Sequence, residues 1–137
     1  MPYQLNIEQK PGYLQVTVTG RNSTDTVARY MQEVMQEVAT RRCPRVLIVE
    51  NLEGPRLGTM EVFTMVTAGS KRYHGQLEAL AFVDLNAEGG VMRFAEDVAV
   101  NRGIPVRVFR TLDGAEKWLL AHSHGAGPNA DSPTQKP

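Results

Sequence analysis

One stretch, from Arg45 to Tyr73, constrains the fold more than any other part of the sequence. It begins with an apolar run, Val46 to Val49, in which three of the four residues are β-branched. Such a run is typical of a strand that is buried on both faces. A loop with two glycines and one proline is expected next, from Glu50 to Gly58, and Thr59 is the predicted N-cap of a helix. A strand, a glycine-containing loop and a helix in this order place a binding edge at the carboxyl end of the strand.

The helix predicted after Thr59 has very little polar surface. Glu61 is its only charged residue before Lys71, and Gly75 is the expected C-cap. A helix of this kind is expected to be buried on more than one side. The domain itself, a partner or a ligand would have to cover it.

The remaining patterns predict strands and helices that alternate along the chain. Two antiparallel strands are expected at Gln4 to Glu8 and Tyr13 to Thr19, and buried strands at Leu80 to Val83 and Val106 to Phe109. The other helices are expected after a cap at Ser23, Thr24 or Asp25, over Ala87 to Arg102 with Asn86 as cap, and after a cap at Thr111. This order predicts a single α/β domain with a mixed, mostly parallel five-stranded sheet and four helices. The predicted domain covers residues 1–121, and residues 122–137 are expected to form a flexible tail because they are poor in apolar residues.

Composition excludes several classes of function. The formal net charge is zero, which argues against binding to nucleic acid or to an anionic membrane surface. Cys43 is the single cysteine, so no disulfide framework or thiolate zinc site is expected. No apolar run has the length of a membrane span, and the first residues do not resemble a signal peptide. We therefore expect a cytoplasmic protein without membrane insertion.

The order of elements, together with three local segments, resembles a known family. The segments are RVLIVENLEG, LGTMEVF and LDGAEKWL. They are similar to STAS-type domains, and most similar to their SpoIIAA-like, or STAS/SEC14-like, branch. The resemblance covers about Met1 to Ala121. It implies the SpoIIAA-like (STAS) fold and a non-enzymatic role, either in protein–protein signalling or in binding a lipid-like ligand.

The loop and first helical turn after the central strand form the candidate binding edge. Its glycines permit close approach, and a helix N-terminus favours an anion. The candidate partner- or ligand-binding residues are Asn51, Gly54, Arg56, Gly58, Thr59, Met60 and Phe63. The resemblance also implies that Thr59 is a possible phospho-acceptor, although the Asp-Ser-Ser part of the family's pattern is missing. The alternative is that Thr59 only caps its helix.

Two other groups of residues allow more than one interpretation. Glu50 and Asp84 each end a buried strand and are expected at the same edge, where paired carboxylates can act as acid and base. We interpret them as solvated strand ends or caps. Methionines recur on three predicted helices, as Met31, Met35, Met60, Met65 and Met92. They either fill the core or line a ligand groove or dimer face.

The sequence thus predicts no catalytic residues, no cofactor and no metal site. The first functional hypothesis is a STAS-like interaction or regulatory domain that binds a protein partner or itself, most simply as a homodimer. The alternative is a small carrier that holds a lipid-like apolar ligand between its helices.

Overall fold

The computed structural model describes residues 3–86 and 90–121, which form one α/β domain. The strands are β1 (Tyr3–Lys10), β2 (Tyr13–Arg21), β3 (Arg45–Glu53), β4 (Ala79–Asp84) and β5 (Val106–Phe109), and the helices are α1 (Thr24–Arg41), α2 (Thr59–Arg72), α3 (Val91–Asn101) and α4 (Leu112–Ala121). The predicted tail, residues 122–137, lies outside the described residues.

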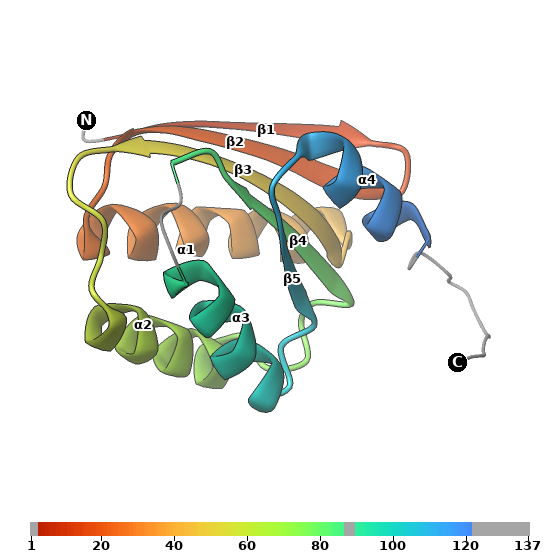
Figure 1. Ribbon diagram of the computed structural model, residues 1–137. Helices are drawn as coiled ribbons and strands as arrows, with labels where there is room; N and C mark the ends of the chain where they lie inside the picture. The colour runs from red at the N-terminus through yellow and green to blue at the C-terminus, as the bar shows by residue number, and fades with distance from the viewer. Residues whose placement is uncertain (1–2, 87–89, 122–137) are drawn as a thin grey trace.

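The five strands lie in the sheet in the order of the sequence, β1-β2-β3-β4-β5. β1 and β2 are antiparallel, and every later pair is parallel. Helices α1, α2 and α3 lie on one side of the sheet, whereas α4 packs on the other side against β3, β4 and β5 (Figure 1). The predicted mixed sheet with four helices is therefore confirmed.

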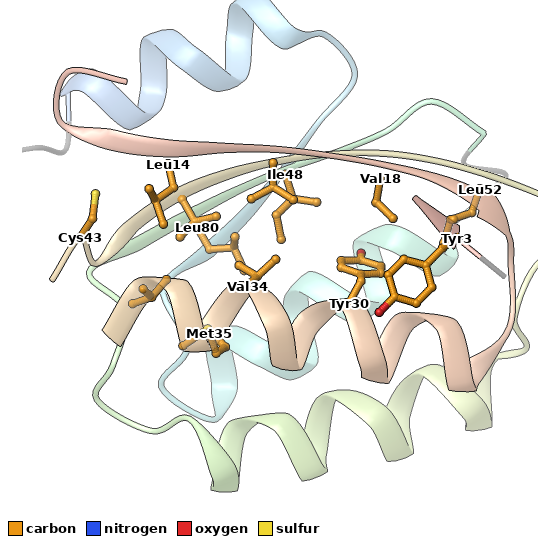
Figure 2. Packing of buried hydrophobic residues seen from close by; sticks show 13 residues of the cluster. Tyr3, Leu14, Val18, Tyr30, Val34, Met35, Cys43, Ile48, Leu52 and Leu80 are labelled. Carbon is orange, nitrogen blue, oxygen red and sulfur yellow. The ribbon is translucent and has the colours of Figure 1, made fainter. Parts of the chain in front are cut away.

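Both faces of β3 are buried, as its apolar run predicts. Val46 and Ile48 belong to the larger core cluster, which α1 covers, while Leu47 belongs to the cluster beneath α4. Figure 2 shows side chains of α1, among them Tyr30 and Val34, packed under the sheet. The alternation of side chains along a strand produces this division.

β3 is longer than its apolar run indicates. It continues through Glu50 to Glu53, because these residues pair with β2 as far as Arg21, and Glu50 also pairs with Asp84 of β4. The prediction that a loop begins at Glu50 is wrong, since backbone pairing with two neighbouring strands outweighs the weak strand propensity of Glu and Asn. The loop between β3 and α2 is confined to residues 54–58.

The predicted helix ends are correct in some places and wrong in others. Ser23 caps α1, and the Thr111 hydroxyl accepts a hydrogen bond from the Gly114 N–H at the start of α4. The N-cap of α2, however, is Gly58 rather than Thr59, because the Val62 N–H already bonds to the Gly58 carbonyl.

The other two corrections concern the end of α2 and the start of α3. The C-cap of α2 is Tyr73, and Gly75 lies in the turn beyond it with a φ of 79°. The N-cap of α3 is Gly90 rather than Asn86, and the predicted helical residues 87–89 lie outside the described residues.

The prediction that α2 is buried on more than one side is also wrong. Ser70 is its only buried residue among those described, and its apolar side chains are half-buried or exposed. α2 packs mainly against α3, with a smaller contact with α1. It lies on the side of α1 that faces away from the sheet (Figures 1 and 2).

Removing the cap of α1 tests this assignment of helix ends. The Ser23 hydroxyl accepts a hydrogen bond of 3.0 Å from the Thr26 N–H. Ser23→Ala should lower the free energy of unfolding by about 1 kcal/mol in urea denaturation. Thr59→Ala is the matched control and should stay within a few tenths of a kcal/mol of wild type, because Thr59 is exposed and follows the cap. A larger loss for Thr59→Ala than for Ser23→Ala would contradict the assignment.

Candidate functional site

A cavity of about 450 Å³ lies between α2 and the rest of the domain. α1, α2 and α3 contribute most of its wall, and β3, β4 and β5 contribute the remainder. The apolar residues that line it include Val27, Met31, Met35, Leu57, Val62, Met65, Val66, Leu77, Leu80, Phe82, Met92, Ile104, Val106 and Val108. The cavity explains why the apolar residues of α2 are incompletely buried, since several of them face this space.

Methionines are prominent in the wall. Met31 and Met35 come from α1, Met65 from α2 and Met92 from α3. Only Met60, at the start of α2, points away from the domain, with 72% of its surface exposed. The methionine side chain is unbranched and polarisable, so it adapts to ligands of irregular shape. Four of the five methionines thus fit the interpretation of a ligand groove between helices.

Polar residues gather where β3 and β4 end. Glu50 and Asp84 are paired in the sheet register and both line the cavity. Only 5% of Glu50 is exposed, and its carboxylate accepts a hydrogen bond from the buried Tyr30 hydroxyl of α1. The interpretation of Glu50 as a solvated strand end is therefore wrong, because α1 covers this end of β3.

Arg56 turns back from the β3–α2 loop toward the same carboxylates. One of its terminal nitrogens is 3.7 Å from Asp84 Oδ1, and the other donates to the carbonyls of Leu52 and Gly54. Asn22 steadies the same loop by donating a hydrogen bond of 2.8 Å to the Pro55 carbonyl. The guanidinium is thereby held by groups of the protein itself.

Burial dominates the electrostatics of Glu50. The pKa of its carboxyl is raised from 4.5 to about 7, mainly by desolvation and also by the charge of Asp84 and a hydrogen bond with the Asp84 carboxyl. The hydrogen bond from Tyr30 and the charge of Arg56 act in the opposite direction. Burial beside Glu50 also raises the pKa of Tyr30 well above its ordinary value, so the tyrosine remains a hydrogen-bond donor.

The structure separates the predicted binding residues into four groups. Arg56 lines the cavity. Asn51 projects from the opposite face of β3, where its side-chain oxygen accepts a hydrogen bond from Asn86. The exposed group at the start of α2 comprises Gly54, Gly58, Thr59 and Met60.

Phe63 belongs to neither the cavity wall nor the exposed group. Its ring packs under the Arg102 guanidinium, 5.2 Å from the ring centroid. The recurring methionines had indicated the part of the wall on α1 and α3, whereas no sequence pattern indicated that Val106 and Val108 of β5 also line the cavity.

The described residues contain no group of three or more His, Cys, Asp or Glu side chains that could hold a metal ion. None of the described helices is both long enough and apolar enough to cross a membrane.

Glu50 makes stability depend on pH in a direction that can be tested. The pKa of Glu50 is raised in the folded state. Its contribution to the free energy of unfolding is therefore fully present below about pH 4.5 and is lost as pH rises through about 7. The wild type should therefore lose roughly 3 kcal/mol of unfolding free energy across this window relative to Glu50→Gln, which cannot ionise. Urea denaturation of both proteins at pH 5 and pH 8 measures the difference. If the free energies of unfolding of the two proteins changed in parallel between pH 5 and pH 8, the prediction of a raised pKa for Glu50 would be wrong.

Comparisons with known proteins and structures show that the chain is similar to other proteins in fold only. No protein-family model matches the chain, and no curated protein matches it. The solved structures that are similar to it include two that each have 18% sequence identity. An anti-sigma factor antagonist from Mycobacterium paratuberculosis has a TM-score of 0.56, with 86% of this chain and 94% of that chain covered. An uncharacterised protein with a SpoIIAA-like fold from Shewanella loihica has a TM-score of 0.54, with 85% and 93% covered.

Both similarities cover at least 85% of this chain and at least 93% of the other. The chain therefore has the SpoIIAA-like fold of STAS-type domains.

Proposed function

We propose that the protein is a non-enzymatic binding module that holds an apolar small molecule between α2 and the rest of the domain. The observation that carries this proposal is the cavity of about 450 Å³ with its largely apolar wall. Pockets for small ligands have volumes in this range and combine apolar walls with a few polar groups. An apolar cavity of about 150 Å³ already holds a benzene molecule, so this one suits a considerably larger ligand.

The packing of α2 supports the same proposal. Protein interiors contain few voids larger than a water molecule, so a space of this size beside a helix requires an explanation. Val62, Met65 and Val66 of α2 line the cavity and remain half-buried. A bound ligand would cover these side chains, and each methylene group removed from water contributes about 0.8 kcal/mol.

The wall of the cavity favours binding over catalysis. A carboxyl group with a pKa near 7, such as that of Glu50, is able to move a proton. However, the described lining includes no histidine, cysteine or lysine that would act with it as nucleophile or base. The Ser70 hydroxyl donates to the Thr67 carbonyl of its own helix. We therefore assign Glu50 to ligand recognition.

Filling the cavity tests the proposal. Gly69 lines the cavity, and a Cβ atom at this position would meet nothing within 4 Å. Gly69→Leu should place its side chain in the space and weaken binding of the uncharged fluorescent probe N-phenylnaphthylamine at least tenfold. Its thermal stability should not fall, because leucine has a higher helix propensity than glycine. A fluorescence titration and a thermal melt measure the two effects.

Lys71→Leu provides the matched control, since Lys71 is exposed on the same helix and does not line the cavity. It adds the same side chain outside the proposed site and should bind the probe like wild type. Equal binding by wild type and Gly69→Leu would contradict the proposed site.

The second candidate function is association with a protein partner, or with a second copy of the chain, through the start of α2. The exposure of Met60 favours it, because methionine is enriched in protein–protein interfaces. The similar structure from Mycobacterium paratuberculosis is described as an anti-sigma factor antagonist, which is a protein with a protein partner. A phosphate on Thr59 would lie at the positive end of the helix dipole within this surface. For both candidate functions, we propose that the protein is located in the cytoplasm.

Analytical ultracentrifugation tests self-association at this surface. The wild type should sediment as a dimer at micromolar concentration, and Met60→Asp should shift it to monomer while leaving the thermal melt unchanged, because Met60 is exposed. A wild type that is monomeric throughout the concentration series would remove homodimerisation from this candidate.

A further inference from the structure

The polar groups at one end of the cavity distinguish between ligand head groups, whereas the apolar wall contacts only the apolar part of a ligand. We propose that this polar end selects a ligand with a protonated amine as head group, a single-chain alkylammonium whose amine pairs with Glu50 while its chain occupies the apolar space. This inference rests on the proposed binding of an apolar molecule and specifies the class of that molecule.

Glu50 is the anchor because it has capacity to accept more hydrogen bonds. An ionised carboxylate accepts about four hydrogen bonds, whereas Glu50 has two polar partners, the Tyr30 hydroxyl and the Asp84 carboxyl. An ammonium group supplies three donors and a compensating charge. Because only 5% of Glu50 is exposed, such a pairing is stronger there than it is in bulk water.

Arg56 is poorly placed to anchor an anionic head group instead. Its guanidinium already interacts with Asp84 and with the carbonyls of Leu52 and Gly54. A ligand carboxylate would have to displace these partners. It would also lie beside Glu50 and Asp84, whose negative charges would repel it.

The charged groups around Glu50 come from several elements. Asp84 of β4 contributes a negative charge, Arg56 of the loop a positive one, and Tyr30 of α1 a neutral donor. Glu96 of α3 also lines the cavity, and its carboxylate accepts a hydrogen bond of 2.7 Å from the Val108 N–H.

The cavity wall contains one more cation, Arg72, but it is the last residue of α2. The loop that carries Arg56 leads into the other end of this helix, about 20 Å away along the axis. Among the described residues, Glu50, Asp84 and Arg56 therefore leave one negative charge in excess at this end when both carboxyl groups are ionised.

The test compares three ligands with the same chain length in competition with N-phenylnaphthylamine at pH 8. Decylamine should displace the probe at a concentration at least tenfold lower than decanol, and decanoic acid should be weaker than decanol. Glu50→Gln should lose the preference, so that decylamine and decanol displace the probe at similar concentrations. A thermal melt of the variant confirms that it is folded.

The pH dependence of the wild type gives a second measurement that needs no variant. Decylamine remains protonated between pH 5.5 and pH 8, whereas Glu50 becomes protonated as pH falls through about 7. Displacement by decylamine should therefore weaken several-fold at pH 5.5, while displacement by decanol should not change.

The outcomes separate this inference from the proposed function. Equal displacement by decylamine and decanol, or a preference for decanoic acid, would overturn the selection of an amine and leave the binding cavity intact. Failure of the wild type to bind the probe, decylamine and decanol would overturn the proposed function itself.

Discussion

The pairing of β3 with β2 and β4 is the interaction on which the rest of the structure depends. Its parallel ladder with β2 extends four residues beyond the apolar run, to Glu53. The same extension sets Glu50 opposite Asp84 and beneath α1. If β3 ended at Val49, the carboxylate would lie in a solvated loop with an ordinary pKa. Backbone hydrogen bonding thus converts a polar strand end into a buried group that faces a cavity.

The second constraint is the distance of α2 from the sheet. α2 rests on α3 and α1, so the apolar side chains that would pack on strands in a filled core line an internal space instead. Such an arrangement leaves dispersion contacts unmade, which a well-packed core would avoid. A ligand restores these contacts, and this is the physical reason to connect the position of the helix with binding.

The two ends of the cavity offer different interactions. The wall of methionines and branched residues accommodates apolar groups of varied shape, whereas Glu50, Asp84 and Arg56 place charged groups at one end. A site of this form binds amphipathic molecules in a single orientation. The exposed start of α2, with Met60, is distinct from this interior, so ligand binding and protein association need not compete for the same side chains.

Local patterns in the sequence determined the order of strands and helices, the antiparallel start of the sheet and the cap at Thr111, and they limited the cap of α1 to Ser23, Thr24 or Asp25. They are local because alternation, helical spacing and capping involve residues within a few positions of one another. The tertiary structure alone decided that β3 reaches Glu53, that Glu50 is buried, and that four methionines line a cavity while Met60 is exposed. A sequence pattern shows which side chains avoid water. Whether they meet protein atoms or an internal space depends on the distance between elements that are far apart in the chain, which no local pattern encodes.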